Sequence, residues 1–349
     1  MLYSYPIEAT KGNWLQACLC RILRTIHASI RNSVPVPGWP DLIPTTYRSD
    51  LQRRTGLRNR LEQYATELAN LTPLDRRVVY IAICGQNRIR RLLSNQCNCA
   101  RLDELPAGIR TAASNLSREA FRLLSKLGIR DEQYQTIYNT IRHKVCPFCG
   151  LEYFDAPEAP REDLDHYLPQ SRYPFAGANL KNLVPMGGRC NSAYKGKTDM
   201  LWNGTTRRRA FFPYGHPGVS VSLKNSSPFG GTNVQHPCWE VSFSQDSEEI
   251  QTWDDVFHIR ERYKRDVLDP EYESWLRGFK TFCEPLGLQP TDTTGLLDAM
   301  QHFHKVCEED GLSGKGFLKS AVFEMLIYHC QQDNQRLIHL LMKVATAAA

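Results

Sequence analysis

Asp165 and His166 are adjacent in the sequence, shortly before Pro169, and both side chains can take part in hydrolysis. A neutral imidazole can accept a proton near pH 7, because its unperturbed pKa lies close to that value. A carboxylate oxygen is a hard ligand that suits Mg²⁺ or Mn²⁺. The two residues could also be ordinary polar residues of a turn, so the surrounding sequence has to decide between these interpretations.

Further polar and sulfur-bearing groups accompany this pair between residues 144 and 199. In chain order the groups are Cys146-Pro-Phe-Cys149, Asp165-His166-Tyr-Leu-Pro169, Asn182-Leu-Val-Pro185, and Cys190-Asn191 followed by Lys195. Each group is weak by itself, but their order and spacing together are specific. In this segment the sequence resembles the HNH, or ββα-metal, endonuclease family. The resemblance covers about one sixth of the chain.

The resemblance implies a role for each matching residue. His166 matches the general base, and Asp165 matches a ligand of the catalytic Mg²⁺ or Mn²⁺. Asn191 matches a second metal ligand at the start of the expected helix. Asn182 matches the middle asparagine, whose hydrogen bonds across the loop orient the histidine. Lys195 lies one turn after Asn191, where its cation could meet a phosphate oxygen.

Many members of that family also bind a structural Zn²⁺ through two CxxC pairs. The first pair is present here, but Gly187 stands where the second pair would need its first cysteine. Cys146, Cys149 and Cys190 could bind zinc with a fourth ligand from elsewhere, or they could pack as plain thiols in a small core. The candidates for the fourth ligand are His143, Cys97, Cys99, Asp199 and Cys238. A redox role for the CPFC pair is disfavoured, because glycine and proline after Cys149 prevent the helix that this chemistry uses.

Charge is unevenly distributed along the chain, whose formal net charge is +6. Residues 1–143 hold 21 Lys and Arg against 11 Asp and Glu, and nearly all of these cations are Arg. Guanidinium groups bind phosphate in a bidentate way, so the bias favours a polyanionic partner, although solvated helix faces would give the same count. The run Arg207-Arg208-Arg209 could add to such a nucleic-acid-binding surface.

Apolar periodicity predicts a fold that is mainly α with a small central α+β unit. Helices are expected over 12–31, from about 48, after the Thr72 cap with Pro73 in the first position, over 106–127 and 131–143, and near Asn334–Val344. The expected domains are an Arg-rich helical domain (1–143), the HNH ββα-metal unit (144–200), a loop- and strand-rich extension (201–247) and a C-terminal helical domain (248–349). No apolar stretch is long enough to span a bilayer, so we expect a cytoplasmic protein with no membrane partner.

These features together predict a metal-dependent HNH endonuclease that hydrolyses phosphodiester bonds of DNA, with restriction or anti-phage defence as its setting. RNA is the alternative substrate. The third interpretation is a nucleic-acid-binding or complex-forming ββα protein without turnover. The long helical flanks could also bind a partner protein.

Overall fold

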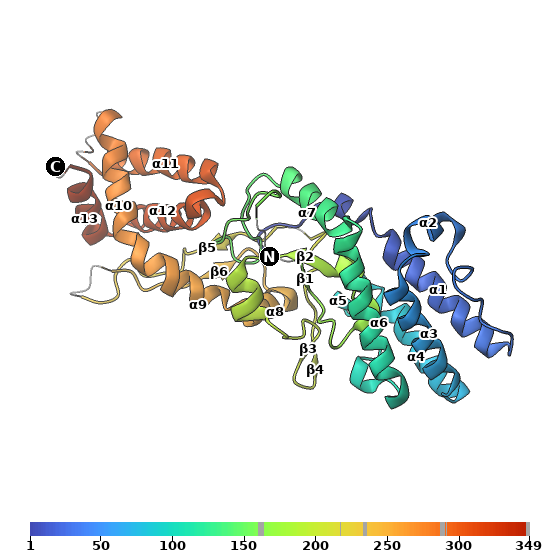
Figure 1. Ribbon diagram of the computed structural model, residues 1–349. Helices are drawn as coiled ribbons and strands as arrows, with labels where there is room; N and C mark the ends of the chain where they lie inside the picture. The colour runs from blue at the N-terminus through green and yellow to red at the C-terminus, as the bar shows by residue number, and fades with distance from the viewer. Residues whose placement is uncertain (160–163, 217, 233–235, 287–289, 291, 347–349) are drawn as a thin grey trace. The chain divides into compact units, whose positions relative to one another are not determined.

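The structure is a computed structural model that describes residues 1–159, 164–216, 218–232, 236–286, 290 and 292–346 (Figure 1). It is mainly helical with short antiparallel strand pairs, as the sequence predicts. The chain divides into two compact units. Unit 1 comprises Met1–Tyr3, His143–Tyr153 and Gly218–Ala349, and unit 2 comprises Ser4–Arg142 and Phe154–Pro217. This division differs from the four consecutive domains that we expected, because the CxxC pair and the Asp165-His166 pair belong to different units.

Unit 2 contains the N-terminal helices. Their bounds are α1 Trp14–Arg31, α2 Arg48–Leu51, α3 Thr55–Ala69, α4 Pro73–Gln86, α5 Ile89–Leu93, α6 Ala107–Lys126 and α7 Ile129–Thr140. Shorter turns are η1 Ile7–Thr10, η2 Thr45–Tyr47 and η3 Leu102–Glu104. The predicted helix start at Thr72 is confirmed, since its side chain accepts a hydrogen bond from the Asp75 backbone N–H. Helix α1 packs on α4, and α3 packs on α6.

Two short strands cross this helical framework. Strand β1 (Leu164–His166) pairs antiparallel with β2 (Leu183–Pro185), so that His166 lies opposite Leu183 and Asp165 opposite Val184. Leu164 and Leu183 are buried in the same apolar cluster as the helices. Alternation along a strand then directs Asp165, the middle residue of β1, to the other face.

The rest of unit 2 contains short turns, a π-helix and a second hairpin. The turns η4 Pro174–Ala176 and η5 Leu180–Asn182 lie between the strands, and the π-helix η6 Arg189–Lys195 follows β2. A further hairpin joins β3 (Trp202–Asn203) to β4 (Thr206–Arg207). The π-helix η6 ends before Gly196, whose φ is +46°.

Unit 1 contains the C-terminal helices. Their bounds are α8 Glu248–Phe257, α9 Ile259–Tyr263, η7 Lys264–Leu268, α10 Asp269–Cys283, η8 Glu284–Leu286, α11 Thr293–Asp310, η9 Ser313–Lys315, α12 Gly316–Gln331 and α13 Gln335–Thr346. Strands β5 (Val221–Ser222) and β6 (Ser242–Phe243) pair antiparallel. The predicted C-terminal helix is confirmed, and α11 packs along α12. Among the described helices, none combines the length and the apolar character needed to cross a membrane.

Candidate active site

His166 is placed by the end of β1 and by the loop that follows it. The side chain is 9% exposed, and its Nε2 lies 2.8 Å from the carbonyl oxygen of Gly177. A carbonyl oxygen only accepts hydrogen bonds, so the neutral ring carries its proton on Nε2 and its lone pair on Nδ1. The ring of Phe121 on α6 lies 4.4 Å away between centroids. The imidazole is therefore fixed in one tautomer with Nδ1 available as a base.

Burial, a hydrogen bond and nearby charges all shift the pKa of His166. Burial, the largest effect, lowers it to about 4. The hydrogen bond to Gly177 and the charge of Asp165 raise the pKa, while Lys195 and Arg130 lower it. The imidazole is consequently neutral at pH 7, which is the state that a general base requires.

Asn182 holds the two ends of the loop between the strands. Its Oδ1 accepts a hydrogen bond from the Leu168 backbone N–H at 2.8 Å, and its Nδ2 donates to the Leu168 carbonyl at 3.0 Å. Nδ2 also lies 3.3 Å from the Ala176 carbonyl. The side chain is fully buried. These hydrogen bonds join both ends of the loop that follows β1.

Gly177 has no room for a side chain. A Cβ at this position would overlap Ser117 Oγ and lie 2.9 Å from Gln170 Nε2. Ser117 is on α6, and its hydroxyl is hydrogen-bonded to Gln170 at 3.0 Å. Gly177, whose carbonyl fixes His166, is therefore packed directly against α6.

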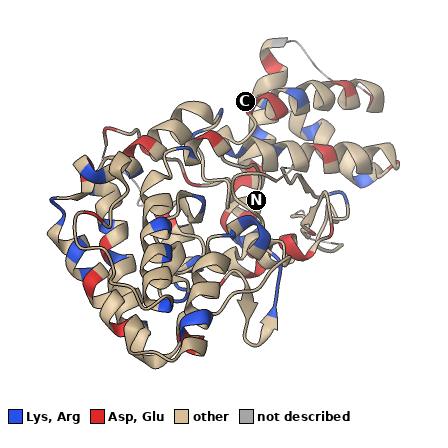
Figure 2. Cartoon of the chain, turned by 90° about the vertical axis from the view of Figure 1, so that its right-hand side faces the viewer, with Lys and Arg blue, Asp and Glu red and all other residues tan. Residues whose placement is uncertain are grey.

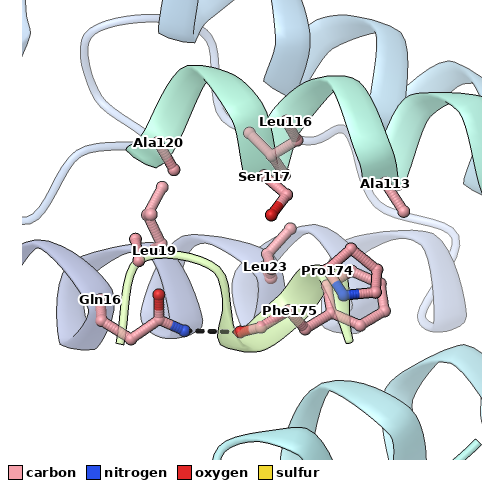
Figure 3. Close-up of a pocket in the computed structure, with 10 residues that line it drawn as sticks. Gln16, Leu19, Leu23, Ala113, Leu116, Ser117, Ala120, Pro174 and Phe175 are labelled. Carbon is pink, nitrogen blue, oxygen red and sulfur yellow. Dashed lines mark hydrogen bonds between the residues drawn. The ribbon is translucent and has the colours of Figure 1, made fainter. Parts of the chain in front are cut away.

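The same loop is attached to α1 and α4 by amide side chains that the sequence analysis missed. Gln16 on α1 and Asn87 after α4 both donate to the Phe175 carbonyl, at 2.7 and 3.0 Å, and Gln16 also donates to the Asn87 side-chain oxygen at 2.7 Å. Gln86 accepts from the Phe175 backbone N–H at 2.8 Å. Asn and Gln at the ends of otherwise apolar helices are the signal that could have indicated these contacts. Figure 3 shows Gln16 reaching Phe175 beside a small apolar cavity of about 20 Å³, which has room for a single water molecule.

Asp165 is partly exposed and forms an ion pair. Its Oδ2 lies 3.0 Å from Nζ of Lys195, whose side chain is only 1% exposed. The ammonium group also lies 3.3 Å from the Gly196 carbonyl. Lys195, which the sequence suggested as a phosphate contact, is thus buried against the carboxylate that was expected to hold the metal. Asn191 is half-buried in η6, where its backbone N–H donates to the Gly187 carbonyl.

The Arg207-Arg208-Arg209 run is not a continuous exposed surface. Arg207 donates to backbone carbonyls of Leu92 and Leu201, and its guanidinium lies 5.9 Å from the Trp202 ring centroid. Arg208 is 7% exposed and donates to the Asp199 carbonyl at 2.7 Å. Arg209 is exposed.

Cys146 and Cys149 form a tight turn in unit 1. The Gly150 backbone N–H donates to the Cys146 carbonyl at 2.7 Å, and the Leu151 N–H lies 3.4 Å from the Cys149 sulfur. Gly150 has a φ of +71°, and a Cβ there would lie 2.5 Å from Leu2. The chain then returns to pair Tyr153 with Val145, so no helix follows the cysteines.

The remaining candidate zinc ligands have varied surroundings. Cys190 is buried in η6 of unit 2. Asp199 accepts hydrogen bonds from the Tyr173 hydroxyl at 2.9 Å and the Leu201 N–H at 2.9 Å. His143 Nδ1 lies 3.1 Å from Ser313 Oγ. Cys97 and Cys99 are half-buried, and Cys238 is exposed.

Comparison with known proteins adds no assignment. No protein-family model, no curated protein and no solved structure matches this chain.

Proposed function

We propose that the chain is a metal-dependent endonuclease that hydrolyses phosphodiester bonds of DNA. The proposal rests on one observation: the Gly177 carbonyl holds the His166 ring with its proton on Nε2, which leaves Nδ1 able to accept a proton. His166 also follows directly after Asp165 in the sequence. The order of two antiparallel strands and a short helix around this pair supports the same conclusion. The resemblance to HNH nucleases was inferred from the same residues.

In the proposed reaction, Nδ1 of His166 removes the proton from the attacking water. The positive charge that forms on the ring is then stabilised by Asp165, the charge that already raises the pKa of His166. The Nε2 proton stays hydrogen-bonded to the Gly177 carbonyl throughout. Asn182 keeps the loop closed, so that the ring does not turn away from the phosphate.

The oxygen donors of Asp165 and Asn191 suit a hard divalent cation. Mg²⁺ commonly takes one or two protein oxygens and completes its shell with water and substrate phosphate. Asp165 offers a partly exposed carboxylate, one oxygen of which forms an ion pair with Lys195. Asn191 offers an amide oxygen. When bound, Mg²⁺ or Mn²⁺ would supply Lewis-acid stabilisation of charge on the phosphate.

We further propose that Cys146, Cys149 and Cys190 bind a structural Zn²⁺. All three thiols are buried. The turn supports this assignment, because the Leu151 N–H that points at the Cys149 sulfur would stabilise a thiolate. Thiolate ligands select zinc over Mg²⁺.

The test is cleavage of supercoiled plasmid by the purified protein with Mg²⁺, Mn²⁺ or EDTA, beside His166→Ala. We expect cutting that requires the metal and disappears in the variant. A parallel incubation with single-stranded and duplex RNA separates a DNA enzyme from an RNA enzyme. Intact plasmid and intact RNA under every metal condition would refute the proposed activity.

A further inference from the structure

The arginines of unit 2 fall into two classes according to whether they have a partner. On α3 and α6 these arginines have side-chain partners: Arg58 and Arg122 pair with the carboxylates of Glu62 and Glu119. Arg60 and Arg118 donate hydrogen bonds to the amide oxygens of Gln63 and Asn115. On α1, α4 and α5 the exposed arginines have no carboxylate partner among the residues that the structure describes. Among the described residues, those without a side-chain hydrogen bond or ion pair include Arg21, Arg24, Arg77, Arg90 and Arg91, together with the exposed Arg88 between α4 and α5.

Helices α1 and α4 pack side by side in antiparallel directions. We call this pair of helices the seam. Gln16 bonds Asn87 at 2.7 Å, and further along the helices the ring of His27 lies 5.5 Å from that of Tyr80. Cys20 on α1 and Cys84 on α4 lie close enough to interact electrostatically, and Arg24 also acts on Cys20. The seam therefore carries arginines of both helices along its outer side. Figure 2 marks basic residues in blue and acidic residues in red on the helices.

Negative charge is nearly absent from these helices. Neither α1 nor α5 contains an acidic residue, and α4 contains only Asp75. The Asp75 carboxylate is engaged by the Thr72 hydroxyl at 2.8 Å at the start of α4. Guanidiniums without neighbouring carboxylates repel one another, so an anionic partner would stabilise them.

The seam leads to the proposed catalytic loop. Gln16 and Asn87 at its end both donate to the Phe175 carbonyl, and Gly177, two residues later, holds His166. Arg88 follows directly after Asn87, and Arg90 and Arg91 lie on the next helix, α5. Helix α4 has 14 residues, so it is about 21 Å long, the length of about six base pairs of duplex.

A second group of arginines shows the contrast. A hollow of about 600 Å³ in unit 2 is lined by Arg101, Arg110 and Arg172. Arg101 is paired with Glu104 at 2.9 Å, and Arg172 with Asp199 at 3.3 Å. Since the charges of these two arginines are already compensated within the fold, they have less to gain from a phosphate.

We propose that the α1–α4 seam with α5, defined by Arg21, Arg24, Arg77, Arg88, Arg90 and Arg91, is the surface that grips the phosphate backbone of duplex DNA beside the His166 loop. This inference rests on the proposed nuclease function and names the part of the protein that binds its substrate. Phosphate contacts carry no sequence information, so the seam positions the duplex without selecting a base sequence.

The test compares two fourfold variants of the full chain that remove the same charge. The seam variant carries Arg21→Gln, Arg24→Gln, Arg77→Gln and Arg88→Gln, and the control variant carries Arg58→Gln, Arg60→Gln, Arg118→Gln and Arg122→Gln. Binding of a labelled DNA duplex of about 30 base pairs is measured by fluorescence anisotropy in EDTA across a range of salt concentrations. Circular dichroism establishes that both variants are folded.

We expect the seam variant to bind at least about tenfold more weakly at about 0.15 M salt, with a log–log salt slope smaller by about 0.9 for each phosphate that the variant no longer neutralises. The control variant should keep the wild-type slope. Equal slopes in the two variants would overturn the inference, as would an absence of DNA binding by the wild type. Displacement of the duplex by polyglutamate at equal charge concentration would overturn it too, because the surface would then recognise acidic polypeptide.

Cleavage separates this inference from the nuclease proposal. Suppose that the seam variant binds DNA weakly, whereas the wild type binds it strongly but does not cleave it with Mg²⁺ or Mn²⁺. This result would support the seam as the DNA-binding surface and refute the nuclease activity. A seam variant that binds and cuts like the wild type would refute the seam alone.

Discussion

The loop around His166 and the turn around Cys149 reach order by different means. The His166 loop is held by neutral groups: the Asn182 amide, the Gly177 carbonyl and the amides of Gln16 and Asn87. These hydrogen bonds need no ion. In the cysteine turn, the Leu151 backbone N–H donates a hydrogen bond to the Cys149 sulfur, and the Glu152 carboxylate lies 3.7 Å from the same sulfur. Hydrogen bonds from Trp253 and Tyr263 to the Phe148 and Cys149 carbonyls also hold this turn. We therefore predict that the proposed zinc adds to the order of the turn, whereas it leaves the order of the His166 loop unchanged.

Removal of the proposed zinc should produce the largest difference in order between the cysteine turn and the His166 loop. Structural zinc in small sites contributes roughly 10 kcal/mol or more to folding, so a strong chelator should disorder the turn. Hydrogen exchange would be followed in peptides covering 145–153 and 164–186. We expect the first to lose protection and the second to keep it. Equal behaviour of the two peptides would break the comparison, and Cys146→Ser should reproduce the chelator's effect.

Acidification should weaken unit 2 through its two buried histidines. His27, which lies 3.0 Å from the Tyr64 hydroxyl, and His166 each have a pKa lowered to about 4, mainly by burial. Between about pH 6.5 and 4 the unfolded chain binds protons that the folded chain does not, so stability falls as the pH falls through this range. Each histidine accounts for at most about 3 kcal/mol.

Urea unfolding at pH 7.5 and pH 5 measures this effect. His27→Phe should reduce the pH dependence by about half, because it removes one of the two groups. An unchanged pH dependence in His27→Phe would contradict the assignment of burial as the cause.

Asn182→Ala should disturb the loop of unit 2 without affecting the turn of unit 1. The substitution leaves the Leu168 N–H and C=O without their side-chain partner in a buried place, which costs about 1–3 kcal/mol. We expect faster exchange at Leu168 and slower plasmid cleavage, with unchanged zinc content. Wild-type exchange at Leu168 in the variant would show that the loop does not depend on the amide.

The smallest effects should distinguish Arg208 from Arg209. Arg208→Gln removes a buried guanidinium that donates to the Asp199 carbonyl, so it should lower stability by about 1–3 kcal/mol. Arg209→Gln changes an exposed residue and should stay within about 0.5 kcal/mol. Thermal unfolding of the two variants checks the order, and a reversed order would contradict the orientations described for this run.

The sequence predicts the local features of the fold well. Apolar spacing and the Thr72 cap place the helices, and the Asn182 motif anticipates hydrogen bonds across the loop. Pairings between distant residues are harder, because spacing shows the face of a residue but not its partner. The pairing of Lys195 with Asp165 and the inward direction of Arg207 and Arg208 were missed for this reason. The predicted domain boundaries stay a prediction; the structure places Cys149 and Asp165 in different compact units.

The central claim is that His166 is the general base. Its position in the proposed site, rather than burial alone, should make it essential for cleavage. His27 is the matched control, because it is buried in the same unit with the same lowered pKa but has no place in the proposed site. The measurement is plasmid cleavage by His166→Ala and His27→Ala, each with and without added imidazole. We predict that His166→Ala loses about 10²–10⁴ of the rate and regains part of it with imidazole, while His27→Ala cuts at nearly the rate of the wild type. Equal losses in the two variants, or full activity in His166→Ala, would contradict the account.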